Sequence, residues 1–226
     1  MNKLKIELIN IQKNFNNQST VLENVNAIFE TGKIYGLIGG NGSGKSVLLK
    51  IICGLYKPTE GKVIVDGEDI FKEQSFPKDT RALIEKPNFL PELTGLENLE
   101  LLASIQKKIS KNEILETLKK VKLEKEMNKK FGKYSLGMKQ KLGIAQVLME
   151  DPKIMIFDEP FNGIEVKTAN EIRNLLIKEK EKGKLIIISS HMVEDTKLLA
   201  DEVYELSDYT LKKVIKNSKK DKKLLI

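Results

Sequence analysis

Residues 39–46 read GGNGSGKS and match the pattern G-x-x-x-x-G-K-[ST] of a phosphate-binding loop. An apolar run over residues 34–38 precedes this loop as a short buried strand, and apolar residues follow it on one side of a predicted helix. The glycines let backbone N–H groups turn inward around a polyphosphate, and the helix N-terminus adds partial positive charge. The segment therefore predicts an α/β fold with a phosphate site where the strand meets the helix.

Two side chains of this loop have predicted chemical roles. Lys45 is expected to reach the β- and γ-phosphates as a catalytic residue, and Ser46 is expected to hold Mg²⁺. Further contacts to the phosphates are expected from Gly39, Asn41, Gly42, Ser43, Gly44 and Val47. The alternative is a glycine-rich turn that precedes a helix by chance. It is disfavoured because all eight positions fit the motif and lie between a predicted strand and a predicted helix.

Length and composition restrict the class of protein. The chain has 226 residues, enough for one large α/β domain, and its 40% hydrophobic and 31% charged content is typical of a soluble globular protein. No run approaches the roughly 18 apolar residues of a membrane span, and the strand-like N-terminus lacks the features of a signal peptide, which predicts a cytosolic protein. With one cysteine, Cys53, and one histidine, neither an internal disulfide nor a zinc-type cluster can form.

The net charge of +7 comes partly from a lysine-rich tail at residues 212–226. Its composition favours a disordered, solvated segment, and attraction to an anionic membrane surface is the functional alternative. Nucleic-acid binding is disfavoured, because no aromatic residue alternates with these lysines beyond Tyr209 upstream.

The order of segments predicts the architecture. Strand-like runs at residues 3–9, 25–29 and 63–65 come first, and residues from about 81 to 145 are helical in character, including a capping box of Ser110 and Glu113. Apolar strands at 154–157 and 185–188 then alternate with helices at 166–182 and up to Ala200. This order predicts one P-loop NTPase domain: α/β with a mostly parallel sheet, N-terminal antiparallel strands and an inserted α-helical subdomain.

Polar side chains follow two of the predicted strands. Asp158 and Glu159 come directly after residues 154–157, at the strand end where α/β sites form. We assign Asp158 to Mg²⁺ and Glu159 to the general base that orients the attacking water, although an acidic pair alone is more often a helix cap or turn. His191 follows residues 185–188 at the same edge, where it is expected to hydrogen-bond the γ-phosphate; a lone histidine is more often structural.

Residues 134–141 read YSLGMKQK and lie between the phosphate loop and the acidic pair. In that order the set resembles the nucleotide-binding subunit of an ABC transporter. The resemblance implies that Ser135 and Gly137, at a helix start, contact the γ-phosphate of ATP held by the opposite subunit, and a helix N-terminus suits such an anion. Leu136 and Met138 stand where many members carry Gly and Gln.

The resemblance extends over residues 4–209 and assigns roles to three further residues. Phe15 is expected to stack on adenine, and a core or edge aromatic is its alternative. Glu85 stands where the family usually carries Gln; it can bind hydrated Mg²⁺ but would repel the γ-phosphate unless the metal screens it. Glu165 replaces the usual Asp of the segment that crosses the dimer interface.

The resemblance thus implies an ATP- and Mg²⁺-dependent ATPase that acts as a head-to-tail dimer, either a homodimer or a heterodimer with a related ATPase. A transmembrane permease on a separate chain would dock on it at the inner face of the cell membrane, with export favoured over import. Glu85 and YSLGMKQ resemble the bacitracin- and lantibiotic-resistance branch, which removes antimicrobial peptides. A P-loop kinase or soluble NTPase and an ATP-gated clamp with little hydrolysis are the alternatives.

Overall fold

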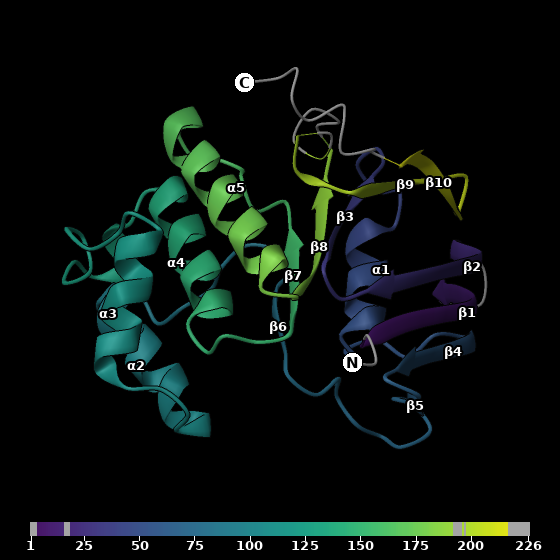
Figure 1. Cartoon of the computed structure of the whole chain (residues 1–226), viewed down its shortest axis with the longest axis horizontal. Coiled ribbons are helices and arrows are strands. Elements are labelled where there is room, and N and C mark those ends of the chain that lie inside the picture. Colours follow the sequence, from purple (N-terminus) through teal and green to yellow (C-terminus); the bar gives the residue numbers. More distant parts are fainter. Residues whose placement is uncertain (1–3, 16–18, 192–195, 197, 217–226) are drawn as a thin grey trace.

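The computed structural model describes residues 4–15, 19–191, 196 and 198–216 (Figure 1). Its antiparallel sheet has the strand order β2-β1-β4-β5. These strands are β1 (Lys5–Phe15), β2 (Ser19–Glu30), β4 (Glu60–Val65) and β5 (Glu68–Asp69). The predicted N-terminal strands are present and are longer than expected. The pairing of β1 with β2 continues, through register shifts, beyond the residues whose apolar and polar side chains alternate.

The second sheet has the order β10-β9-β3-β8-β7-β6, and its strands from β9 to β6 run parallel. They are β3 (Lys33–Ile38), β6 (Thr80–Leu83), β7 (Ile154–Asp158), β8 (Leu185–Ser190), β9 (Glu202–Ser207) and the antiparallel edge strand β10 (Thr210–Lys216). The parallel register places the ends of β3, β7 and β8 at one edge, with Asp158 opposite Ser189 and Ile38 opposite Ser190.

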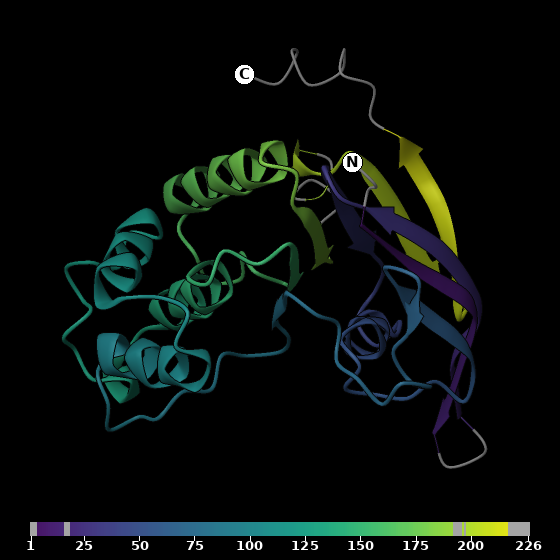
Figure 2. The same cartoon turned by 60° about the horizontal axis from the view of Figure 1, so that its bottom comes forward.

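Two apolar cores cover the two faces of the parallel sheet. Ile154 and Ile156 of β7 join the core around α1 (Lys45–Ile52), whereas Met155 and Phe157 join the core of the other helices. Figure 2 shows α1 between the antiparallel sheet and the parallel sheet, as the shared core requires. A strand buried on both faces explains why residues 154–157 are continuously apolar.

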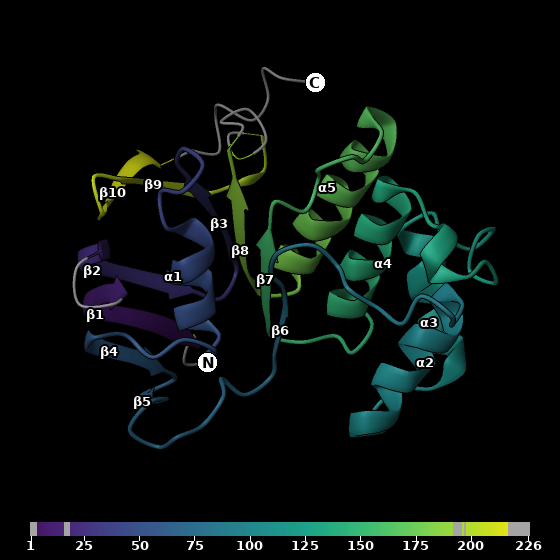
Figure 3. The same ribbon diagram turned by 180° about the vertical axis from the view of Figure 1, so that it is seen from behind.

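The remaining helices lie on the other side of the parallel sheet (Figure 3). They are α2 (Gly95–Gln106), α3 (Lys111–Lys120), α4 (Leu136–Leu148) and α5 (Val166–Glu181), with a 3₁₀ turn at Phe131–Lys133. α2 begins with a capping box in which Thr94 accepts from the Glu97 N–H at 3.2 Å. The predicted box at α3 is present too, with the Ser110 N–H 2.7 Å from the Glu113 carboxylate. These helices and sheets confirm the predicted fold class.

Two predicted boundaries were wrong. Residues 80–83 form the edge strand β6 rather than part of the helical region. Four residues are too few to show a strand-like alternation, and hydrogen bonding to β7 makes this segment a strand. Residues 212–216 belong to β10 rather than to a disordered tail, because β10 pairs with β9 and Lys213 donates to Glu202 at 2.7 Å. Residues 217–226 lie outside the described residues, as does most of the helix predicted to end at Ala200. No described helix combines the length and apolar character needed to cross a membrane.

Candidate active site

The phosphate loop joins β3 to α1 in a conformation that glycine permits. Gly44, the residue before α1, has a φ of 102°, in the left-handed region where side chains other than glycine are strained. At Gly39 an added Cβ would stand 2.5 Å from the Leu206 carbonyl oxygen and 2.7 Å from Ser43 Oγ. Both glycines are therefore required by the path of the loop.

The loop borders a cleft of about 380 Å³ that Asp158 and Glu159 also line. Its other lining residues are Val21, Asn41, Gly42, Ser43, Gly44, Lys45, Ser46 and Val47. Ser43 Oγ is buried without a hydrogen-bond partner among the described residues, so the loop has an unused polar atom that suits a phosphate oxygen. The cleft therefore brings together the predicted phosphate contacts of the loop except Gly39, the predicted metal ligands Ser46 and Asp158, and the predicted base Glu159.

Lys45 is buried at the base of the loop. Its Nζ donates to the carbonyl oxygens of Gly39 at 2.8 Å and Gly40 at 3.1 Å. An ammonium group has three donors, so one remains for a phosphate oxygen while these two bonds hold the side chain in place. This arrangement suits the predicted role of Lys45.

Asp158 and Glu159 are adjacent in the chain, but their side chains contact different residues. Asp158 is the last residue of β7, is 5% exposed and accepts from Ser189 Oγ. Glu159 has a φ of 50°, and its N–H donates to the Ser189 carbonyl oxygen at 3.2 Å and to Ser189 Oγ at 3.1 Å. Ser189 thus holds the backbone of one carboxylate residue and the side chain of the other.

His191 contacts the proposed base rather than standing alone. Its Nδ1 lies 2.8 Å from Glu159 Oε2, and both side chains are partly exposed. An ionised carboxylate only accepts, so this contact would need a proton on Nδ1, and Nε2 of a neutral ring would then be an acceptor. Donation from Nε2 to a phosphate would therefore need the doubly protonated ring. The predicted contact of His191 with the γ-phosphate remains a prediction.

Residues 134–141, which contain Ser135 and Gly137, do not line the cleft of their own chain. Ser135 caps α4, with its Oγ accepting from the Met138 N–H at 3.3 Å. At Gly137 an added Cβ would stand 2.4 Å from the Gly163 carbonyl oxygen, so only glycine lets α4 approach the segment after Glu159 so closely. Gln140, which is buried, donates from Nε2 to the Glu159 carbonyl oxygen at 3.1 Å. The first half of α4 is thereby bonded to the turn that carries Glu159.

Neither Phe15 nor Glu85 lines the cleft. The Phe15 ring meets Tyr56 edge to face, with centroids 5.9 Å apart, and Lys13 Nζ lies 4.9 Å from its centre. The Glu85 carboxylate forms an ion pair with Lys50 of α1 at 2.5 Å. The adenine contact of Phe15 and the metal contact of Glu85 therefore remain predictions.

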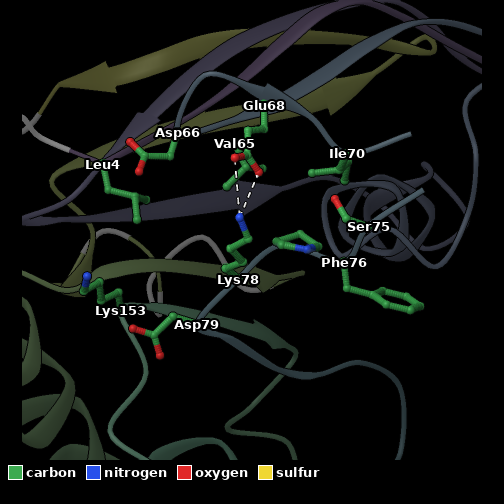
Figure 4. Close-up of a pocket in the computed structure, with 11 residues that line it drawn as sticks. Leu4, Val65, Asp66, Glu68, Ile70, Ser75, Phe76, Lys78, Asp79 and Lys153 are labelled. Atoms are coloured by element: carbon green, nitrogen blue, oxygen red, sulfur yellow. Dashed lines mark hydrogen bonds and ion pairs between the residues drawn. The ribbon is translucent and has the colours of Figure 1, made fainter. Parts of the chain in front are cut away.

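Sequence reasoning did not assign Ser189, Gln140 or Lys50. Ser189 was visible as part of Ser-Ser-His after a strand, but only the register of β7 against β8 shows which serine faces Asp158. A separate hollow of about 210 Å³ lies beside β4 and β5 and contains none of the predicted site residues (Figure 4). Leu4, Val65, Ile70 and Phe76 line it together with the ion pair of Lys78 and Glu68.

A family model described as ABC transporter matches residues 22–162. The chain belongs to this family. It is 43% identical over 202 residues, which are 89% of the chain and 92% of the relative, to the uncharacterized ABC transporter ATP-binding protein YybJ of Bacillus subtilis. Bacitracin transport ATP-binding protein BcrA of Enterococcus faecalis is 40% identical over 88% of this chain and 65% of its own length. Lantibiotic transport ATP-binding protein SrtF of Streptococcus pyogenes is 36% identical over 88% and 84%.

A solved structure supports the same assignment. A dimeric, post-hydrolysis state of the ATP-binding cassette MJ0796, bound to ADP and Pi, has a TM-score of 0.85 and 28% identity, covering 94% of this chain and 99% of that one. The chain is therefore an ATP-binding subunit and an ATPase of the ABC type, similar to the bacitracin and lantibiotic transport proteins. It spans about 65% of the length of BcrA.

Proposed function

We propose that this ABC ATPase powers the export of antimicrobial peptides through a transmembrane permease on a separate chain, at the inner face of the cell membrane. The similarity to BcrA and SrtF, named for bacitracin and lantibiotic transport, supports the peptide class. Family membership supports a membrane partner, because the ATP-binding protein of such a transporter works with a pore. The peptide pocket would belong to that partner.

The cleft supports hydrolysis of ATP by an activated water. Ser46 and Asp158 would hold Mg²⁺, which when bound neutralises charge on the phosphates. Glu159 accepts a proton from water as the water oxygen bonds to the γ-phosphorus and the bond to the β–γ bridging oxygen breaks, which leaves ADP and phosphate. Lys45 places its ammonium beside the phosphates and offsets their charge.

The position of Glu159 carries this proposal. Its backbone is held on two sides, by Ser189 and by Gln140, and its carboxylate reaches His191 Nδ1 at 2.8 Å. A base held in this way loses little freedom when it takes a proton from a positioned water. His191 then orients the carboxylate.

We further propose a head-to-tail dimer, of two copies or of this chain and a related ATPase, in which Ser135 and Gly137 complete the site of the partner. Neither residue lines the cleft of its own chain. The neighbouring Leu136 is 55% exposed although it is apolar, so this end of α4 has surface for a partner to cover. The solved cassette MJ0796 is dimeric.

Replacing Glu159 with glutamine tests the base. We expect turnover to fall about 10²–10⁴-fold, since a positioned base contributes that much, while ATP binding persists and an ATP-bound dimer accumulates. Phosphate release and size-exclusion chromatography with ATP measure the two effects. Glu124→Gln, an exposed site with the same chemical change, is the control. Unchanged turnover in Glu159→Gln would remove Glu159 from this role.

Peptide export is tested in cells that carry the chain together with the membrane protein that co-purifies with it. We expect these cells to survive bacitracin or a lantibiotic at concentrations that kill cells carrying the Glu159→Gln variant. Equal susceptibility of both strains to every peptide tested would contradict export of this class while leaving hydrolysis intact.

A further inference from the structure

Residues 119–133, which run from the end of α3 to the 3₁₀ turn before α4, form a basic segment of the surface. The segment carries seven lysines and two glutamates, a net charge of +5, against +7 for the whole chain. Its lysines, all of them exposed, are Lys119, Lys120, Lys122, Lys125, Lys129, Lys130 and Lys133. Within the part of the chain that the structure describes, Lys122 pairs with Glu171 and Lys129 with Glu126, and the other five ammonium groups form no ion pair.

The backbone of the basic segment is fixed by packing and by hydrogen bonds. Leu123 is fully buried, and Phe131 is 4% exposed. The Phe131 N–H donates to the Leu93 carbonyl oxygen at 2.8 Å, and the Gly132 N–H donates to the Pro91 carbonyl oxygen at 3.0 Å. The lysines therefore project from an ordered surface, and a partner that binds them need not order the backbone first.

An exposed leucine adjoins the basic segment. Leu90 is 50% exposed and directly precedes Pro91, which is bonded to Gly132. Glu92 and Glu97 also lie on this side of the molecule, and with them the lysines still outnumber the carboxylates by seven to four. Lysines around an exposed apolar side chain are typical of proteins that lie on a membrane surface. There the ammonium groups meet the headgroups, and the apolar side chain enters the boundary with the acyl chains.

Other anionic partners fit the basic segment less well. Phe131 and Tyr134, the aromatic residues in and beside it, are buried and cannot stack on the bases of a nucleic acid. The segment contains no arginine, the residue whose planar group binds a single phosphate with two hydrogen bonds. The compact charges of several lysines instead suit a surface that carries many anions.

We propose that the basic segment and Leu90 bind the anionic lipid headgroups of the bilayer in which the permease lies. The cytoplasmic leaflet of a cell membrane is negatively charged, and each lysine within about a Debye length of it adds to the attraction. The contact goes beyond the proposed function, because it gives the ATPase a hold on the membrane in addition to its permease. The binding itself needs neither ATP nor the permease.

Co-sedimentation of the full chain with vesicles, without nucleotide or permease, tests the proposal. The probe is vesicles of equal parts phosphatidylcholine and phosphatidylglycerol, and vesicles of phosphatidylcholine alone are the neutral reference. We expect binding to the anionic vesicles to weaken about a hundredfold in a four-lysine variant, because each lysine near such a surface contributes a factor of several. This variant is Lys119→Gln/Lys125→Gln/Lys130→Gln/Lys133→Gln. Leu90→Gln should weaken binding about tenfold, because it removes an apolar side chain that the bilayer would bury.

The matched control removes four exposed lysines near β4 and the hollow of Figure 4, whereas α3 lies at the opposite end of the molecule (Figure 1). It is Lys62→Gln/Lys72→Gln/Lys78→Gln/Lys153→Gln, and it should bind within about twofold of the natural chain, since charges beyond a Debye length are screened. Both variants are also measured with the lysine-rich tail neutralised, so that the tail cannot mask a loss. The tail substitutions are Lys219→Gln/Lys220→Gln/Lys222→Gln/Lys223→Gln.

The proposal is wrong if the four-lysine variant binds the anionic vesicles as the natural chain does. Equal losses in the variant and the control also overturn it, because net charge alone would then explain them. A natural chain that is retained on a polyglutamate matrix but not by the vesicles would have an acidic protein segment as its partner, which refutes the proposal too. Should thermal melting show that the four-lysine variant does not fold, Lys125→Gln/Lys133→Gln takes its place, with a loss of about tenfold expected.

Failure of this proposal is distinct from failure of the proposed function. The vesicle assay contains neither ATP nor a permease, whereas the turnover of Glu159→Gln and the survival of cells exposed to peptides test the transporter. A chain that hydrolyses ATP normally but does not bind anionic vesicles would refute the lipid contact alone.

Discussion

Replacing Ser189 with alanine removes the group that links the two carboxylate residues of the site. Its buried hydroxyl donates to Asp158 and accepts from the Glu159 N–H at 3.1 Å. The Glu159 N–H keeps a second acceptor, the Ser189 carbonyl oxygen at 3.2 Å, so the main loss falls on Asp158. A hydrogen bond to a charged group contributes about 1.5–3 kcal/mol, and Asp158 is too buried for water to replace it fully.

We therefore expect Ser189→Ala to lower the free energy of unfolding by about 2 kcal/mol, which for a chain of this size lowers Tm by about 4–8 °C. Differential scanning calorimetry measures Tm, and phosphate release measures the accompanying loss of hydrolysis. Ser104→Ala is the control, because its hydroxyl only donates to the Leu101 carbonyl oxygen on an exposed helix face. An equal Tm for Ser189→Ala and the natural chain, or equal losses in both variants, would refute this reasoning.

Two further predictions concern stability. Arg81→Met should lower the free energy of unfolding by about 3–5 kcal/mol in urea titrations, because it leaves the buried Glu150 carboxylate unpaired, and Arg81→Met/Glu150→Leu should recover much of that loss. The pKa of Glu97 is lowered mainly by the hydrogen bond from the Thr94 backbone, so its stabilisation is present above the ordinary value of 4.5 and is lost as the pH falls through the lowered value. The Tm difference between the natural chain and Glu97→Gln should therefore disappear in acid; a difference that grows there would contradict the assignment.

The phosphate loop could be predicted because all of its functional residues are adjacent in the sequence. Eight successive residues carry the backbone turn, the ammonium and the hydroxyl, and the flanking apolar runs reveal the strand and helix that position them. The same holds for β7, whose burial on both faces produces an unbroken apolar run before Asp158. Local order along the chain was sufficient for these features, and with them for the fold class.

Boundaries that depend on pairing could not be predicted in this way. β6 is four residues long and has no readable period, and it is a strand because β7 pairs with it. The lysines of β10 suggested a solvated tail, yet the backbone of this segment pairs with β9. The charge of Lys213 is balanced by the Glu202 carboxylate, to which it donates a hydrogen bond. In both cases partners distant in sequence outweigh local composition.

The amino-acid sequence by itself determined the strand, the glycine-rich loop and the helix of a predicted polyphosphate site, since each part is adjacent to the next in the chain. Only the tertiary structure decided which residues hold the predicted site residues in place: Ser189 against Asp158, Gln140 against the Glu159 carbonyl oxygen, and Lys50 against Glu85. Each contact joins residues 19 to 35 positions apart. Strand register and helix packing determine which of these residues meet, and neither can be inferred from a single segment of the sequence.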